Sequence, residues 1–164
     1  MRNGEHYKDP TAGKAMRRIR TAREGYLEEM GSLRTKPLSI ETVSEANEQE
    51  AVMIWAAHNL WKYPCLRWMF HIPNGGYRNT AEAVHFKRMG VKPGVPDLFL
   101  PCPTNGYHGL WIEMKSQTGR PTALQTEWLE WLKEQGYAAY VCKGAEAAIN
   151  CLKLYLEGGV YDKA

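Results

Sequence analysis

Three charged residues lie in two apolar segments that follow one another closely in this chain of 164 residues. Asp97 begins the apolar run 97–101, and Glu113 and Lys115 lie in the apolar run 109–115. A charged group on an apolar strand is costly unless it is paired or bound to a metal ion. These three side chains are therefore the first candidates for an active site.

The two apolar runs are predicted to pair as a β-hairpin, because Asn105-Gly106 between them is a strong signal for a tight turn. Side chains alternate along a strand, so Glu113 and Lys115 share one face. The turn places Asp97 opposite Glu113, to within one residue. Opposed Cβ atoms are about 4.5–5.5 Å apart, so the two carboxylates would repel and one would take up a proton unless a cation separates them.

Carboxylate oxygens with no His or Cys nearby favour Mg²⁺ or Mn²⁺ over zinc. Such an ion lowers the pKa of a bound water and polarises a phosphoryl oxygen. Lys115 could then orient the nucleophile, help to deprotonate it or offset charge in the transition state, and the sequence leaves these roles open. The simpler alternative is a surface hairpin with a solvated Glu–Lys pair, but the position of Asp97 after Gly94-Val95-Pro96 favours the metal site.

The elements that position these residues follow from periodicity and from turn and capping signals. Asn47 and Glu50 resemble a capping box for a helix that starts at Ser44 or Asn47 and ends near Trp61. Thr122 and Gln125 form the same signal at the start of a helix that Gly136 ends. Two further strands are predicted over 66–72 and 137–142. Two further helices are predicted over 80–89, where Gly90 is the C-terminal cap, and over 144–156. The order α-β-α-β-β-α-β-α predicts an α/β fold with one mixed sheet flanked by helices.

Composition is that of a globular protein, with 44% hydrophobic and 24% charged residues and a net charge of +3. Between residues 1 and 36 there are nine Lys or Arg against five Asp or Glu. We therefore divide the chain into a basic arm over 1–43, with helical spacing over 14–30, and a compact domain over 44–164. The arm is either solvated surface or a segment that contacts DNA or forms a dimer.

The four cysteines lack the spacing of a zinc site, and no apolar run is long enough to span a membrane. The polar first residues do not fit a signal peptide. We therefore expect no membrane partner and a reducing cytoplasm as the compartment.

From Glu45 to Ala148 the chain resembles the virus-type replication-repair nuclease (VRR-NUC) domain of the PD-(D/E)xK nuclease superfamily. The motifs that carry this resemblance are His71-Ile72-Pro73-Asn74-Gly75-Gly76, the run 90–98 with its Gly-Val-Pro-Asp sequence, Glu113-Met114-Lys115, and Gln125 with Trp128. The resemblance does not extend to residues 1–40.

The resemblance implies an αβββαβ restriction-endonuclease-like core and Mg²⁺-dependent hydrolysis of DNA phosphodiesters, with Mn²⁺ able to substitute. Asp97 and Glu113 would be metal ligands together with the main-chain carbonyl of Met114, and Lys115 would be the catalytic lysine. Gln125 matches a family glutamine that supports the site or contacts the substrate.

The family also places an acidic residue on the first core helix, for which Glu45, Glu48 and Glu50 compete. Helical phase favours Glu48, while Glu50 points nearly the opposite way. Three, four and seven residues after Glu48 come the apolar positions Ala51, Val52 and Trp55, which are expected on the same helix face. The resemblance therefore makes Glu48 a candidate catalytic residue and metal ligand. The alternative is an ordinary acid in the first turn of a helix, which the helix dipole favours.

Four residues are candidate DNA contacts. His71 and Asn74 flank Pro73 at the end of an apolar run, where they are either turn residues or lie at the rim of the cleft. Arg78 and Arg120 are the basic residues that we expect to contact phosphates, although scattered basic residues are usually solvated surface.

The family resemblance favours a homodimeric Holliday-junction resolvase of phage or bacterial type, because a four-way junction has near-twofold symmetry and matches paired sites on a C2 dimer. This places the protein in the cytoplasm of a bacterium or of a phage-infected host. The closest alternative is a flap or nicking nuclease that acts as a monomer. A catalytically inactive DNA-binding accessory factor is a further alternative, and the presence of Asp97, Glu113, Lys115 and Gln125 argues against it.

Overall fold

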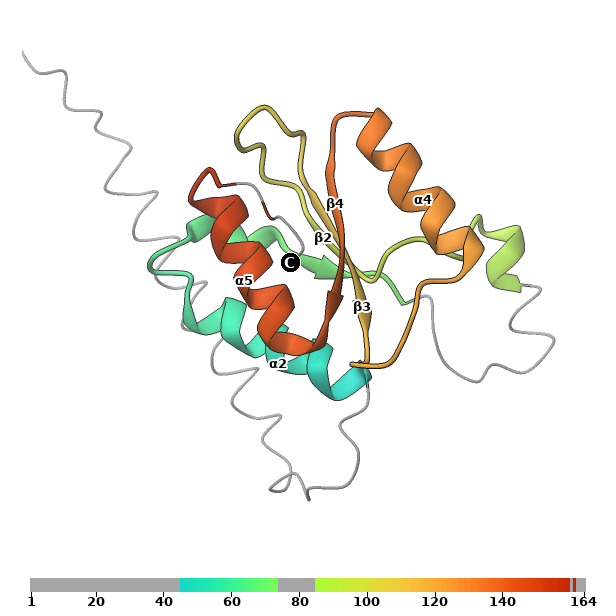
Figure 1. Cartoon of the computed structure of the whole chain (residues 1–164), viewed down its shortest axis with the longest axis horizontal. Coiled ribbons are helices and arrows are strands. Elements are labelled where there is room, and N and C mark those ends of the chain that lie inside the picture. The colour runs from blue at the N-terminus through green and yellow to red at the C-terminus, as the bar shows by residue number, and fades with distance from the viewer. Residues whose placement is uncertain (1–44, 74–84, 160, 162–164) are drawn as a thin grey trace, which may run out of the picture. The chain divides into compact units, whose positions relative to one another are not determined.

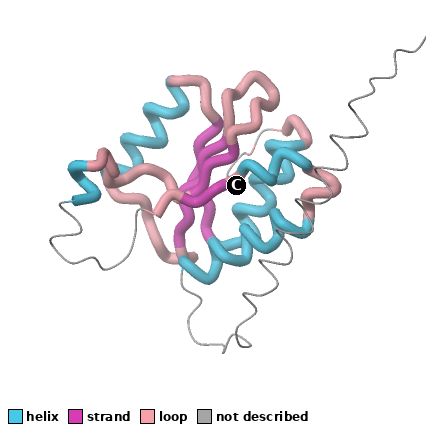
Figure 2. Tube along the Cα trace, turned by 180° about the vertical axis from the view of Figure 1, so that it is seen from behind, coloured by secondary structure: helices cyan, strands magenta, loops and turns pink. Residues whose placement is uncertain are grey.

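The computed structural model describes residues 45–73, 85–159 and 161, so the predicted arm over 1–43 and its helix lie outside the described residues. A central sheet separates two layers of helices (Figures 1 and 2). Helices α2 (Glu45–His58) and α5 (Gly144–Leu156) cover one face, and α4 (Ala123–Glu134) covers the other. The α/β class and the mixed sheet flanked by helices are confirmed.

Four strands form the sheet in the order β1-β2-β3-β4. The strands are β1 (Phe70–His71), β2 (Leu98–Leu100), β3 (Leu110–Lys115) and β4 (Ala138–Lys143). The first two pairs are antiparallel, and β4 runs parallel to β3. Two adjacent parallel strands need a crossover connection, which α4 supplies between β3 and β4. The carboxyl ends of β3 and β4 therefore lie at the same edge of the sheet.

The predicted hairpin forms with its turn at Asn105 and Gly106, whose φ angles of 50° and 83° are both in the left-handed region. Two successive residues with positive φ are what a type I′ turn requires, and Asn-Gly is its preferred sequence. Leu98 pairs with Ile112 in the β2–β3 ladder. One step further along the same register, Asp97 lies opposite Glu113, which is the predicted alignment.

The apolar core lies between the sheet and the pair α2 and α5. Alternate side chains of β2 and β3 are almost fully buried there: Leu98, Leu100, Leu110, Ile112 and Met114. Val52 of α2 and Leu152 of α5 have no exposed surface. On α2 the buried residues continue through Ala56 and Ala57, and Leu60 just after the helix is also buried, whereas Ala51 is exposed, so the apolar position expected at Ala51 does not face the core.

On the other face, α4 packs Leu129 and Leu132 against Ala139 of β4 and against the half-buried Trp111. The helix starts with the predicted capping box, in which Thr122 and Gln125 satisfy each other's backbone amides. Because Trp111, Glu113 and Lys115 alternate with the core residues of β3, they lie on the face that α4 covers.

Two predicted elements differ in the structure. The strand predicted over 66–72 is a 3₁₀ helix, η1 (Pro64–Trp68), followed by the short strand β1. Tyr63, Leu66 and Met69 are buried at a spacing of three, which is the repeat of a 3₁₀ helix and not of a strand. Helix α2 contains Asn47 within its first turn and ends at His58, so Asn47 is not the predicted cap and Trp61 is not in the helix.

Of the helix predicted over 80–89, residues 85–88 are helical and the start lies outside the described residues. Gly90 ends it with φ 92°, and the amide of Val91 donates to the carbonyl of Phe86, as in a Schellman cap. Among the helices of the described ranges, none is long and apolar enough to cross a membrane.

Candidate active site

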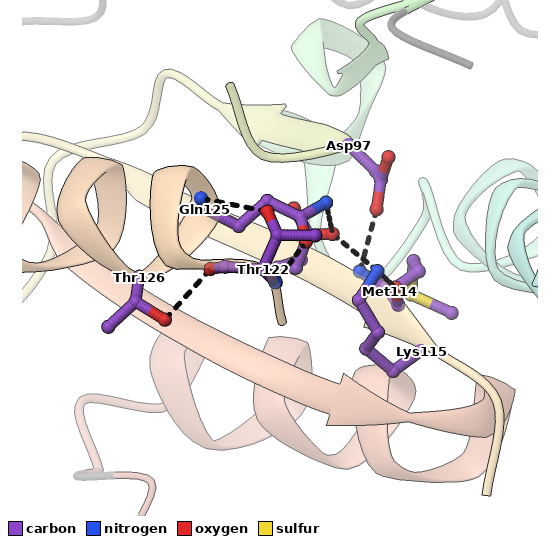
Figure 3. A network of polar contacts seen from close by, with 7 residues as sticks. Asp97, Met114, Lys115, Thr122, Gln125 and Thr126 are labelled. Carbon is purple, nitrogen blue, oxygen red and sulfur yellow. Dashed lines mark hydrogen bonds and ion pairs between the residues drawn. The ribbon is translucent and has the colours of Figure 1, made fainter. Parts of the chain in front are cut away.

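The hairpin brings Asp97, Glu113 and Lys115 together at the end of β3. The Lys115 Nζ atom lies 2.6 Å from Glu113 Oε1, and Asp97 Oδ2 accepts a hydrogen bond of 2.8 Å from the amide of Met114. The Glu113 side chain is fully buried and that of Lys115 is nearly so. Figure 3 shows Asp97, Met114 and Lys115 around this part of the strand.

Glu113 is a carboxyl group whose environment opposes its ionisation. Burial raises its pKa from an ordinary value of 4.5 to about 7, and the hydrogen bond from Lys115 only partly offsets this effect. The negative charge of Asp97 contributes to this rise in pKa. The hydrogen bond from Lys115 is therefore not enough to keep Glu113 fully ionised at neutral pH.

The donor atoms of this site fit a divalent cation. Glu113 Oε2 is buried and has no hydrogen-bond partner among the described residues, although a buried carboxylate oxygen normally has one. Asp97 and Glu113 both offer the hard oxygens that Mg²⁺ and Mn²⁺ prefer. The carbonyl of Met114, the third expected ligand, accepts a hydrogen bond of 2.9 Å from Lys115 Nζ.

Gln125 reaches the same carboxyl group from the first turn of α4. Its Nε2 atom lies 2.5 Å from Glu113 Oε1, and its Oε1 atom accepts a hydrogen bond of 2.8 Å from the amide of Thr122 (Figure 3). Glu113 Oε1 thus receives donors from both Lys115 and Gln125. The capping box of Thr122 and Gln125 was predicted from the sequence and is confirmed, and the resemblance implied that Gln125 lies near the site, which agrees with its contact with Glu113.

The loop before Asp97 packs tightly on the start of α4. Gly94 has φ 83°, and a Cβ atom at this position would lie 2.9 Å from Leu124 Cβ and 3.1 Å from Trp128 Cδ1. Trp128 Nε1 also donates to the carbonyl of Pro93 at 3.1 Å. Only glycine fits both the backbone angle and the contact. Sequence reasoning missed this packing, and the Gly-Val-Pro-Asp run was the available signal.

The candidate DNA contacts are only partly described. His71 Nδ1 lies 3.0 Å from the carbonyl of Asp97, and the amide of Ile72 donates to the same oxygen, so β1 holds the backbone of Asp97 from its other side. Arg120 is exposed in the connection between β3 and α4. Asn74 and Arg78 lie outside the described residues.

Glu48 makes a different contact from the one expected of a metal ligand. It precedes Val52 by one helical turn as predicted, and its Oε2 atom accepts a hydrogen bond of 2.6 Å from the amide of Ala145 in the first turn of α5. Glu50 is exposed, and the side chain of Glu45 is not described. In the described part of the chain no three Asp, Glu, His or Cys residues form a group that could hold a metal ion. Glu48 is a helix cap here, and its catalytic role stays a prediction.

Comparisons with known proteins identify the family of the chain. The model of the VRR-NUC domain matches residues 42–146, which include Asp97, Glu113, Lys115 and Gln125. No curated protein matches the chain. A solved structure described as a VRR_NUC domain protein is 35% identical, with a TM-score of 0.63 over 75% of this chain and 96% of the solved chain. The chain therefore belongs to the VRR-NUC family, whose domain is a nuclease of the PD-(D/E)xK type.

Proposed function

We propose that this nuclease is a divalent-metal-dependent, structure-specific endodeoxyribonuclease, and that it acts as a homodimeric Holliday-junction resolvase in the cytoplasm of a bacterium or of a phage-infected host. The observation that carries the metal dependence is the buried Glu113, with one oxygen held by Lys115 and the other without a partner among the described residues. A carboxylate in this environment is stabilised by a cation beside it.

Asp97 and Glu113 would hold Mg²⁺, with the carbonyl of Met114 as a third ligand and Mn²⁺ as a substitute. When bound there, Mg²⁺ supplies a water of lowered pKa and polarises a phosphoryl oxygen. The side chain of Lys115 lies within hydrogen-bond distance of both Glu113 and the Met114 carbonyl, and we propose that it offsets charge on the scissile phosphate. Gln125 orients the carboxyl group of Glu113 through its amide.

The proposed C2 dimer would present two equivalent sites, which matches the near-twofold symmetry of a four-way junction. His71 and Arg120 lie on exposed surface and are the described candidates for contacts with the DNA backbone. Asn74 and Arg78 also remain candidates for contacts with DNA, for the sequence reasons given above. A flap or nicking nuclease that acts as a monomer is the alternative outcome of the test below.

The test is cleavage of four substrates at one stated salt concentration: a four-way junction, a flap, a splayed arm and a plain duplex, each with Mg²⁺, Mn²⁺, Ca²⁺ or a chelator. We expect symmetric paired nicks on the junction with Mg²⁺ or Mn²⁺ and no cleavage with the chelator. Salt must be held constant because contacts with phosphates weaken as salt increases. A preference for flaps would refute the resolvase assignment, and a preference for plain duplex would refute structure specificity.

Lys115→Ala separates chemistry from binding in the same assay. We expect it to lower the cleavage rate by at least about 100-fold, as for the loss of a group that stabilises developing charge. Lys143→Ala is the matched control, because Lys143 pairs with Lys115 in the parallel ladder but is exposed and makes no contact with Glu113 among the described interactions. It should keep most of the activity. Equal losses of activity in both variants would show that Lys115 contributes only through its positive charge, which attracts DNA, and not through chemistry at the site.

A further inference from the structure

Gln125 is the point at which the start of α4 contacts the active site, and its side chain can bond correctly in only one orientation. A carboxamide has a donor end and an acceptor end, and only the donor end can bond to a carboxylate. In the structure the NH₂ group points to Glu113 Oε1. If the amide turned over, its oxygen would face the carboxylate of Glu113 and repel it.

The group that determines this orientation is the backbone amide of Thr122. Its N–H donates to Gln125 Oε1 at 2.8 Å, and an N–H group can bond to the oxygen end of a carboxamide but not to the NH₂ end. The amide of Thr122 lies at the start of the helix, where backbone donors lack intrahelical partners. The capping box therefore does more than start α4, because it also points the donor of Gln125 at the active site.

Thr122 is itself held in place by the helix that it caps. Its Oγ1 atom accepts a hydrogen bond of 3.3 Å from the amide of Gln125, and its carbonyl accepts bonds of 3.0 Å from the hydroxyl and from the amide of Thr126 (Figure 3). The position of the Thr122 N–H thus depends on the first turn of α4.

The consequence for Glu113 concerns which of its two oxygens stays available. Lys115 and Gln125 both bond to Oε1, and two donors on one oxygen restrict the rotation of the carboxyl group. The other oxygen, Oε2, is the one without a partner among the described residues. Loss of the Gln125 contact would leave the carboxyl group held on Oε1 by Lys115 alone.

We propose that Thr122 is a positioning residue of the active site, whose backbone N–H holds the Gln125 carboxamide with its NH₂ group toward Glu113 and so presents Glu113 Oε2 to the metal ion. This inference rests on the proposed metal-dependent nuclease function. It assigns to a helix-capping residue outside the sheet a part in metal binding, because outer partners that orient a ligand affect metal affinity strongly.

Thr122→Pro is the variant that tests the proposal, because proline has no N–H and its Cδ atom would occupy the place of the hydrogen that now points to Gln125 Oε1. Thr122 has φ −72°, which proline adopts without strain. Thr122→Ala is the matched control, since it also loses the Oγ1 cap but keeps the N–H. We expect the dissociation constant for Mn²⁺, measured by calorimetry without DNA, to rise roughly tenfold in Thr122→Pro relative to Thr122→Ala.

A double-mutant cycle with Gln125→Ala shows whether Thr122 acts through Gln125. In the Gln125→Ala background, replacement of Thr122 by Pro or by Ala should give the same Mn²⁺ affinity. The proposal is overturned if Thr122→Pro and Thr122→Ala bind Mn²⁺ equally well with Gln125 present. It is also overturned if the tenfold difference persists with Gln125 absent, because the effect would then come from the helix and not from the amide contact.

Amide hydrogen exchange of the metal-free protein gives a second measurement that depends on neither catalysis nor metal binding. The Thr122 N–H should be protected in the wild type, and its exchange should be at least about tenfold faster in Gln125→Ala, because the oxygen that accepts its hydrogen bond is gone. Unchanged exchange would overturn the proposal even if Thr122→Pro failed to fold. A wild-type protein that shows this protection but binds no Mn²⁺ would instead refute the metal dependence.

Discussion

Replacing Glu113 with Gln should stabilise the metal-free protein at pH 8 and change its stability little near pH 4. The change keeps the size of the side chain and an oxygen that can accept the hydrogen bond from Lys115, but it removes the charge. Glu113 is fully buried, and its pKa is raised to about 7 chiefly by that burial. The ionised form is therefore the costly form in the folded state.

The sign of the effect follows from proton linkage. The folded protein holds the Glu113 proton more tightly than the unfolded chain, so this group stabilises the fold fully below about pH 4.5 and loses that contribution as the pH rises through about 7. A rise in pKa from 4.5 to about 7 corresponds to about 3 kcal/mol, since a tenfold change in proton affinity is worth about 1.4 kcal/mol. Gln at this position titrates at no pH and has no such loss.

Urea unfolding followed by tryptophan fluorescence measures this difference. Both proteins are freed of metal and unfolded at several pH values from 4 to 8.5, and the difference in unfolding free energy is plotted against pH. Groups that titrate alike in both proteins cancel in this difference. We expect Glu113→Gln to gain about 3 kcal/mol over wild type between the two ends of the range, with most of the change between pH 4.5 and 7.

Mn²⁺ supplies the internal control. At pH 8 the ion should stabilise the wild type, by about 2.7 kcal/mol at 100 times its dissociation constant, and should leave Glu113→Gln nearly unchanged. The wild type with Mn²⁺ and Glu113→Gln should then be nearly equally stable at pH 8. The gain in unfolding free energy of metal-free Glu113→Gln over wild type could instead be independent of pH or grow as the pH falls. Either result would refute the conclusion that Glu113 is buried and costly to ionise.

Two further predictions concern residues that support the site. Glu48→Ala should lower the unfolding free energy of the metal-free protein by about 1 kcal/mol, because it removes the acceptor of the Ala145 amide at the start of α5. Glu48→Gln should lose less, and a drop in Mn²⁺ affinity without loss of stability would show instead that Glu48 is a metal ligand. Gly94→Ala should cost about 1–3 kcal/mol in urea unfolding, since its Cβ would meet Leu124 at a backbone angle that disfavours alanine, and an unchanged stability would contradict that packing.

The parts of the fold that sequence reasoning predicted correctly are those that depend on local rules. The hairpin follows from Asn105-Gly106 and from alternation along β3, and both signals lie within a few residues of the structure that they determine. The capping box of Thr122 is equally local. Of the strand predicted over 66–72 only Phe70–His71 is a strand, and the residues before it form a 3₁₀ helix whose buried side chains lie three apart, a spacing that a short apolar run does not reveal from the sequence alone.

The parts that could not be predicted depend on contacts between residues far apart in the chain. Helical phase correctly places Glu48 with Val52, but its hydrogen-bond partner Ala145 is 97 residues away, so the sequence does not show that the carboxylate caps α5. Gly94 signals a turn, and only the tertiary structure shows that α4 leaves no room for a Cβ atom. The acceptor contact of Gln125 was predictable from the capping box, whereas its position beside the site was expected only from the family resemblance, and its specific bond to Glu113 Oε1 was not.

The energetics of β3 indicate why these particular residues are present. The strand is apolar and buried at Leu110, Ile112 and Met114, and the charged Glu113 and Lys115 are buried between and beyond them. A buried ion pair is weak evidence for stability, because replacing both partners with apolar side chains is often neutral or stabilising. Here burial raises the pKa of Glu113 to about 7, so ionising this carboxyl group costs more free energy in the folded protein than in the unfolded chain. Buried charged residues that do not stabilise the fold are expected mainly at functional sites. Stability therefore does not account for Glu113, whereas the metal-binding role that we propose for it beside Asp97 and Lys115 does.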